Sequence, residues 1–286
     1  MNNYLSEHRL FNRYTFITFA SLIMVLALSW FFVSGLSEVM FMDYSAPDLG
    51  GRDHAQARAE ILPIYLQQIM VWENLLISSM MYIIHVLPLF YILPTMTFSS
   101  ELKSYFVLGA HRFKSYKKSL VAAILKHSFI AALVCSLTFI LFFAINGLFV
   151  TTQHDWMTTV GSFLPDGFYE DHTLLFFAFL FGTVYFLFGF LFALISCGIM
   201  LYIERPYFII IGITVAYYLY LFVGGYFDYF LSMIFGYQVE IFWIGSTVTA
   251  FNTFRSISQV LIPLIPVGVI TGVIIYFGIK RYAKKA

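Results

Sequence analysis

The chain has 286 residues, of which 60% are hydrophobic, 20% are aromatic and only 11% are charged. Soluble domains carry about 25% charged residues, and one core of this size cannot hide so much apolar surface from water. The composition therefore excludes a water-soluble globular protein and predicts an all-α integral membrane protein. The net charge of +1, without a basic stripe bearing stacking aromatics, gives no indication of nucleic-acid binding.

Six stretches are free of Asp, Glu, Lys and Arg: 14–37, 74–100, 127–154, 172–203, 206–227 and 256–279. Each is long enough to cross a bilayer, which takes about 20 residues in a helix. The first is too long for a signal peptide, and no small-residue cleavage site follows it. The expected spans, within a single transmembrane domain covering residues 1–286, are 14–37, 74–98, 120–150, 173–203, 206–227 and 256–279.

The connection between the first two spans contains a predicted amphipathic helix with a polar first turn headed by Asp53. Pro63 is expected either to bend this helix or to mark where it starts. An ordinary exposed loop helix and a substrate gate are both consistent with the pattern. The apolar residues at helical spacing are Leu62, Leu66, Ile69 and Met70.

Polar residues and prolines are sparse inside the spans. Pro88 and Pro94 in the second span are expected to kink it or to leave carbonyl groups for partners on other helices. His85 in the same span and Asn146 near the outer end of the third are candidates to line a pathway. A bond from His85 to a neighbouring helix is the alternative. No chain of Asp, Glu or His crosses the membrane, which disfavours an ion-coupled pump.

The segment 99–119, SSELKSYFVLGAHRFKSYKKS, holds five of the sixteen basic residues. If it is helical, Leu102, Tyr105 and Phe106 share one face, and Gly109 is a natural stop. A purely topological anchor would need the basic residues but not the aromatic patch. The segment is therefore interpreted as a short amphipathic helix that docks a partner.

The loop after the third span is rich in acids and histidines, but their spacing matches no metal motif, so a solvated loop is expected. These residues are His154, Asp155, Asp166, Glu170, Asp171 and His172.

Two short apolar stretches, Tyr229–Val239 and Ile241–Phe254, lie between the fifth and sixth spans; Glu240 divides them, and Asp228 and Arg255 bound them. Neither can cross the bilayer, and their length is typical of a re-entrant or interfacial hairpin. Because the turn of such a hairpin leaves backbone groups unpaired, protein must cover it. We expect it to close the outer end of the bundle, with Glu240 as a third candidate to line a pathway.

The charges predict the orientation. With the N-terminus inside, the inner segments hold thirteen of the sixteen basic residues and three of the fifteen acids. This positive-inside bias predicts that both termini are cytoplasmic, in a multi-pass protein of the cell membrane.

No catalytic constellation is present in the sequence. It contains no Walker A pattern, no H-E-x-x-H zinc site and no G-x-S-x-G nucleophile elbow. Ser196-Cys197-Gly198 and Gly245-Ser246 are small residues that more often serve helix packing, and Cys135 and Cys197 are expected to be buried thiols. We do not expect this chain to be an enzyme.

The architecture resembles the permease subunits of ABC-2 type transporters (six-helix, type V exporter-like): six spans, both termini inside, an interfacial N-terminal segment, a cytoplasmic helix after the second span and a broken hairpin before the sixth. In that family the loop after the second span carries a Glu, an apolar stretch, then an Arg and a Lys. Glu101, Phe106–Leu108, Arg112 and Lys117-Lys118 match this order, with tighter spacing than in many members.

The resemblance implies an exporter of an amphipathic cargo such as a peptide, an antibiotic or a lipid-like molecule. It implies no cofactor in this chain, with ATP and Mg bound by two cytoplasmic ATP-binding subunits, and a second permease subunit, identical or not. The implied coupling surface is Glu101, Leu102, Tyr105, Phe106, Val107, Leu108 and Arg112, joined by Leu5, Arg9, Phe11 and Arg13 of the N-terminal segment. The alternatives are an ATP-independent secondary carrier, a membrane sensor or immunity subunit, and a lipid-modifying enzyme.

Overall fold

The computed structural model describes residues 12–44, 53–107, 115–150, 165, 168–203, 205–251 and 257–284, and every regular element in these ranges is helical. Six helical units are long and apolar enough to cross a membrane, which confirms the predicted all-helical chain with six candidate spans. They are Arg13–Val33, Trp72–Phe106, Tyr116–Asn146, Thr173–Met200, Pro206–Phe235 and Ser258–Tyr282.

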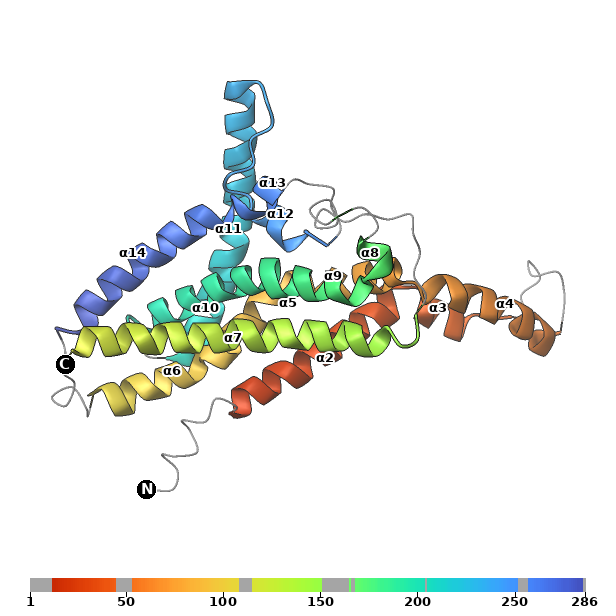
Figure 1. The fold of residues 1–286 in the computed structure, drawn as a ribbon, viewed down its shortest axis with the longest axis horizontal. Helices are drawn as coiled ribbons and strands as arrows, with labels where there is room; N and C mark the ends of the chain where they lie inside the picture. The colour runs from red at the N-terminus through yellow and green to blue at the C-terminus, as the bar shows by residue number, and fades with distance from the viewer. Residues whose placement is uncertain are drawn as a thin grey trace.

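Four helices form the body of the bundle (Figure 1). Helix α7 (Tyr116–Asn146) packs against α10 (Phe186–Met200), and α2 (Arg13–Val33) packs against both α5 (Trp72–Ile92) and α7. Of the six units, those containing α5 and α7 are the most buried in their apolar windows, whereas α2 and the fifth unit are the least buried. The second and third units therefore form the centre of the protein.

The second unit is longer than predicted. After α5 the chain makes a 3-10 turn over Leu93–Thr95, continues as α6 (Met96–Glu101) and ends in a π-helical turn over Leu102–Phe106. The predicted span ended at residue 98, with a separate helix beyond it. The structure instead joins the two into one irregular helix, because no glycine or proline interrupts residues 95–107. We call residues 99–107 the extension.

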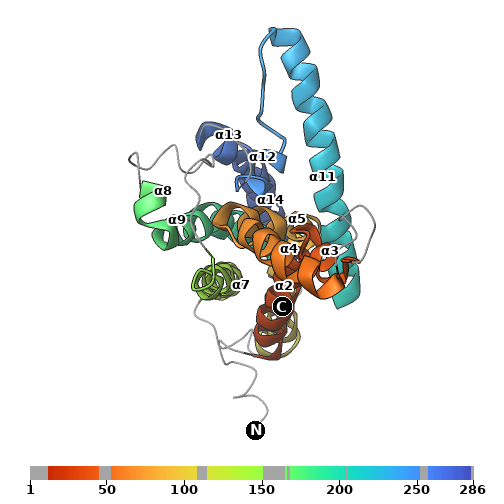
Figure 2. The ribbon, with the colours of Figure 1, turned by 90° about the vertical axis from the view of Figure 1, so that its right-hand side faces the viewer.

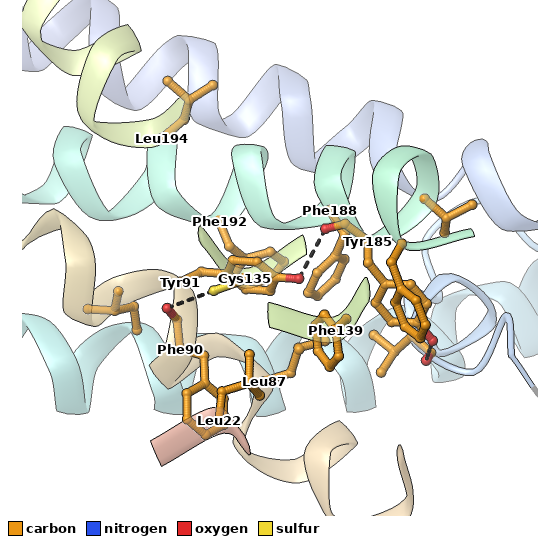
Figure 3. Close-up of a cluster of buried hydrophobic side chains, with 14 of the residues drawn as sticks. Leu22, Leu87, Phe90, Tyr91, Cys135, Phe139, Tyr185, Phe188, Phe192 and Leu194 are labelled. Carbon is orange, nitrogen blue, oxygen red and sulfur yellow. Dashed lines mark hydrogen bonds between the residues drawn. The ribbon is translucent and has the colours of Figure 1, made fainter. Parts of the chain in front are cut away.

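Phenylalanine rings fill the interface between α7 and the fourth unit, which consists of α9 (Thr173–Leu180), a π-helical turn over Phe181–Tyr185, and α10. The ring of Phe143 stacks on Phe177 and Phe181, with ring centroids 5.0 and 5.1 Å apart, and Phe139 stacks on Phe181 at 4.8 Å. Figure 3 shows the neighbouring part of this core around Tyr91, Cys135 and Phe139. Much of the chain's aromatic content therefore packs the interior.

The fifth unit, α11 (Pro206–Phe235), begins with Pro206 in its first turn and ends at Gly236, whose φ of +72° favours glycine. The helix thus continues past residue 227, where the predicted span ended, and takes in most of the first apolar stretch of the predicted hairpin. In Figures 1 and 2 its second half stands clear of the other helices, with the returning chain beside it.

Short elements complete the fold. The return from α11 is extended and leads to α12 (Gly245–Val248), α13 (Ile257–Leu261) and α14 (Leu264–Tyr282), which packs on α10. Helices α3 (Leu36–Phe41) and α4 (His54–Ile69) follow α2, and α8 (Phe168–Asp171) precedes α9. Pro63 lies inside α4 and does not mark its start.

Candidate functional site

At three places along α5, side chains of other helices form hydrogen bonds with its backbone groups. Pro88 cannot donate to the carbonyl of Ile84, and the Tyr217 hydroxyl of α11 donates to that carbonyl at 3.1 Å. Pro94 likewise leaves the carbonyl of Phe90, which accepts the thiol of Cys135 from α7 with a 3.2 Å separation (Figure 3). These contacts confirm that the prolines offer carbonyl groups to neighbouring helices.

At the third place, a serine side chain of α2 inserts between two backbone groups of α5. The Ser29 hydroxyl of α2 donates to the carbonyl of Ser78 at 2.6 Å and accepts the amide of Tyr82 at 3.2 Å. These two groups face each other across one turn of α5, and an insertion of this kind is a recognised cause of bending. Helix α5 is therefore held at separate heights by α2, α7 and α11.

A buried polar contact joins the extension to α7. Nε2 of His127 lies 3.0 Å from a carboxylate oxygen of Glu101, and Nζ of Lys126 lies 3.9 Å from the other oxygen. The other ring nitrogen of His127 lies 3.3 Å from the Thr97 hydroxyl, and Phe98 packs against the imidazole. We call this group, centred on Glu101 and His127, the Glu101 contact.

Two further contacts fix the extension to the bundle. The Tyr282 hydroxyl, at the end of α14, donates to the carbonyl of Leu102 at 2.9 Å. The ring of Phe106 is buried and meets the edge of Tyr116 at the start of α7. A displacement of the extension would therefore be transmitted directly to α7 and α14.

The structure divides the predicted coupling residues between two faces. Leu102 and Phe106 are buried, and the Glu101 carboxylate contacts the His127 imidazole. Tyr105 and Val107 are exposed. The sequence grouped Tyr105 with Leu102 and Phe106, but in the helix Leu102 and Phe106 turn inward together. The exposed surface of the extension is thus smaller than predicted.

Several predicted coupling residues lie outside the described residues: Leu5, Arg9, Phe11, Leu108 and Arg112. Arg13 is described and exposed. It begins α2, and its guanidinium stacks on the ring of Tyr14 at 4.8 Å.

A second buried carboxylate, that of Asp228, anchors the return from α11. Its oxygens accept the backbone amides of Ile241 at 3.0 Å, of Phe242 at 3.0 and 3.1 Å, and of Trp243 at 2.9 Å. One turn further along α11, the Ser232 hydroxyl accepts the amide of Val239 at 2.8 Å. We call Asp228 and the three amides of residues 241–243 the Asp228 clasp.

Close packing below the clasp requires glycine. A methyl group at Gly224 would lie 2.5 Å from the carbonyl oxygen of Phe242. Further along, the Thr247 hydroxyl donates to the carbonyl of Val260, and the Tyr185 hydroxyl donates to that of Val248 at 2.8 Å. The returning chain is thus tied to α11, α13 and the fourth unit, whereas its turn at Gly236 and Tyr237 is exposed and is not covered by other parts of the described chain.

The three predicted pathway residues do not converge. The side chain of His85 is exposed, and its backbone carbonyl, not its ring, makes the contact with α11 by accepting the Tyr218 hydroxyl at 2.6 Å. Asn146 donates to the carbonyl of Phe142 within its own helix at 2.8 Å. Glu240 lies in the returning chain and accepts the Gln238 amide at 2.7 Å.

The small residues singled out in the sequence lie at helix contacts, as predicted. The hydroxyls of Ser196 and Thr95 are 2.8 Å apart, and Cys197 lies 3.7 Å from the Ser128 hydroxyl. A methyl group at Gly198 would meet Ile274 and Ile275 of α14 at 3.0 and 3.1 Å. Cys135 and Cys197 are both buried and free.

An apolar cavity of about 140 Å³ lies between α10, α11 and α14. Its wall consists of aliphatic and aromatic side chains, and the only polar atoms they carry are the hydroxyls of Tyr217 and Tyr220. The lining residues are Phe192, Ile195, Ile199, Ile213, Ala216, Tyr217, Tyr220, Val267, Ile270 and Ile274.

Within the described residues, no three His, Cys, Asp or Glu side chains are grouped to hold a metal ion. Glu73 and His85 lie on the same helix about 18 Å apart along its axis, at 1.5 Å per residue. Neither residue lines the pocket that contains Glu240, so these three titratable side chains are not grouped together.

No family model, no curated protein and no solved structure matches this chain. The Glu101 contact and the Asp228 clasp therefore have to be interpreted from their own chemistry. The sequence pointed to Glu101 but not to His127, whose partner is 26 positions away. It named Asp228 only as the boundary of an apolar stretch. An acid next to a stretch too short to cross the membrane was the one available signal.

Proposed function

We propose that this protein is the membrane-spanning permease subunit of an ABC-2 type transporter in the cell membrane. In this proposal both termini are cytoplasmic, ATP is hydrolysed by two separate subunits, and an amphipathic cargo is exported. The observation that carries the proposal is the extension, a helical end with an exposed apolar tip whose other side contacts α7 and α14.

The tip offers a surface suited to a protein partner. Tyr105 and Val107 are 46% and 55% exposed, and Lys103 lies beside them. On the predicted topology this surface faces the cytoplasm, where the positive-inside bias places it. Aromatic and aliphatic anchors surrounded by charge are typical of the centre of a protein interface.

The buried side of the extension supplies the mechanical connection. A partner that pushes on Tyr105 would displace Glu101 and Leu102, which contact α7 and α14 respectively. In the proposed cycle, closure of the ATP-binding subunits shifts the bundle between two packings and opens a path for the cargo. The chain segment after α11, held by the Asp228 clasp, closes the outer end between cycles.

Two further features support the proposed assembly and cargo. Helices α2, α11 and α14 expose long apolar faces that a second permease subunit or lipid would cover. The cavity between α10, α11 and α14 can hold an apolar chain but offers no charged side chain. This favours a lipid-like or amphipathic cargo over an ion or a sugar.

The first test is the side of the membrane on which the extension lies. Tyr105→Cys should react with a membrane-impermeant maleimide only in inside-out vesicles, and Cys135 and Cys197 give little background because they are buried. Labelling of Tyr105→Cys from outside intact cells would overturn the topology and the proposal with it.

The second test is co-purification from native membranes in mild detergent. We expect vanadate-sensitive ATPase activity to accompany the protein and to be lost in the Tyr105→Ala, Val107→Ala double variant. Tyr207→Ala is the matched control, because Tyr207 is a similarly exposed aromatic at the start of α11. Cargo flux in vesicles without ATP or a partner would instead identify a secondary carrier.

A further inference from the structure

The end of α14 carries three basic side chains on one side of the helix. Lys280, Arg281 and Lys284 are all exposed, and together with Phe277 they border an open hollow of about 460 Å³. These four residues are spaced at i, i+3, i+4 and i+7, so they lie on one face. Ile279, between them in the sequence, is buried against the bundle. The hollow therefore lies on the outward side of α14.

The basic side chains at this hollow are available for an anionic ligand. Within the described residues the ion pairs are those of Glu101 with Lys126 and His127, and none of them involves α14. The guanidinium of Arg281 lies over the ring of Tyr202, 5.4 Å from its centroid, which holds the group in place without neutralising its charge. Cations in a last turn complement the helix dipole, but this effect does not require that they share a face with an aromatic ring.

An exposed apolar stripe continues the same face of α14 away from the hollow. Ile270, Val273 and Phe277 are 45%, 51% and 55% exposed, and they are spaced at i, i+3 and i+7. They belong to the sixth unit, which is long and apolar enough to cross a membrane. The basic side chains that follow this stripe therefore lie where lipid head groups are found.

The stripe leads to the apolar cavity between α10, α11 and α14. Ile270 is part of the cavity wall and is also exposed, so the cavity opens onto the outward side of α14 at this residue. Ile270 lies about 15 Å along the helix axis from Lys280, at 1.5 Å per residue. This distance is about half the hydrocarbon thickness of about 30 Å, which is the depth that one lipid chain reaches. The hollow, the stripe and the cavity thus match the head group, the chain and the chain end of one lipid.

We propose that this side of α14 binds an anionic phospholipid. The negative head group contacts Lys280, Arg281 and Lys284, and one acyl chain runs along Phe277 and enters the cavity at Ile270. A lipid is favoured over a free phosphate because the exposed apolar stripe follows the basic side chains on the same face. The binding does not depend on the proposed function, and its tests need no ATPase partner.

The first test compares two head groups. The full chain in dodecyl maltoside micelles is titrated with phosphatidylglycerol and with phosphatidylcholine of the same acyl chains, and bound lipid is counted by native mass spectrometry. We expect phosphatidylglycerol to bind at least about tenfold more tightly, because each basic residue near an anionic head group raises the affinity severalfold. Equal binding of the two lipids would overturn the proposal. Inorganic phosphate should not displace the lipid at constant ionic strength, and displacement would instead identify a site for free phosphate.

Variants locate the head group. The double variant Lys280→Gln, Lys284→Gln should weaken phosphatidylglycerol binding at least about tenfold. The matched control is Lys117→Gln, Lys118→Gln, which removes the same charge from exposed residues at the start of α7, at the same end of the bundle. It should leave the binding unchanged. Gel filtration and circular dichroism establish that both variants are folded. An equal loss in the two double variants would show a general attraction to this end of the bundle and would overturn the site.

A fluorescence measurement locates the acyl chain. Ile270→Trp is reconstituted in phosphatidylcholine that contains a small fraction of a lipid brominated near its chain ends. Brominated phosphatidylglycerol should quench this tryptophan more than brominated phosphatidylcholine does, and the excess should vanish with Lys280→Gln, Lys284→Gln. Met24→Trp, a similarly exposed position about 16 Å from the start of α2, should show no excess. Equal quenching by the two lipids at Ile270→Trp would overturn the placement of the chain.

Discussion

The Glu101 contact and the Asp228 clasp each use a carboxylate to join two segments that are separated in the sequence, but they are built differently. Glu101 meets the side chains of His127 and Lys126, which can change rotamer. Asp228 meets the amides of three consecutive backbone residues. A side-chain contact can break while both helices stay intact, whereas the clasp cannot open without unpairing the backbone of residues 241–243.

The difference indicates which end of the bundle is suited to move. The Glu101 carboxylate is only partly buried and its partners are side chains, so it can exchange partners without unpairing any backbone group. Charge-assisted bonds to backbone amides are stronger, and an unpaired amide in a membrane protein is costly. We therefore expect a permanent anchor at Asp228 and a reversible one at Glu101.

The largest effect is expected for Asp228→Asn. The amide side chain retains one acceptor but turns donors toward the backbone amides, so at least one is left unpaired. Loss of a buried bond to a charged group costs about 3 kcal/mol, which should lower the melting temperature in detergent and expose residues 237–243 to protease. Ser232→Ala, which removes a single bond to the same segment, should have a much smaller effect. Equal melting temperatures for the two variants would contradict the clasp.

Gly224→Ala tests the clasp from the packing side. Its methyl group would lie 2.5 Å from the Phe242 carbonyl, whereas that of Gly225→Ala would lie 3.4 Å from the Trp243 ring. Overpacking of this kind costs about 1–3 kcal/mol, so Gly224→Ala should melt several degrees lower than Gly225→Ala. The two neighbouring variants share the same change in helix propensity, and a reversed order would show that Phe242 does not lie against Gly224.

The Glu101 contact should contribute less to stability than the clasp, and the effects of changing Glu101 and His127 should depend on each other. Glu101→Gln and His127→Asn are each expected to destabilise the protein by about 1–2 kcal/mol, and the double variant by less than their sum. A double-mutant cycle from thermal unfolding measures this coupling. Either single variant should also raise the reactivity of Val107→Cys toward maleimide, which Asp228→Asn should not do. Strict additivity would mean that Glu101 and His127 do not interact.

The smallest effect is expected for Tyr282→Phe, which removes one hydrogen bond between α14 and the extension. Interhelical hydrogen bonds in membrane proteins contribute about 0.6 kcal/mol on average. Tyr202→Phe, which removes a similar bond to the carbonyl of Ile274, provides a control of equal size. Only Tyr282→Phe should increase labelling of Val107→Cys.

The candidate sites were only partly predictable. The sequence drew attention to Glu101, to Glu240 and to the stretch that begins at Tyr229. It also anticipated that the prolines of the second span would offer carbonyl groups to other helices. It did not predict that the side chains of Tyr217 and Cys135 donate to these carbonyl groups, or that Asp228 binds the backbone amides of the returning chain. Those pairings depend on how far each helix is shifted along its neighbours, which no local pattern records.

By itself the sequence determined the number of membrane-length helices and the helical class, because hydropathy and length add up residue by residue along the chain. The tertiary structure alone decided which side of the extension is buried, where α11 ends and what Asp228 binds. Leu102 and Phe106 turn inward because α7 and α14 lie against them, and Asp228 is satisfied because the chain returns beside it. Such contacts are formed between segments, so only their arrangement in space specifies them.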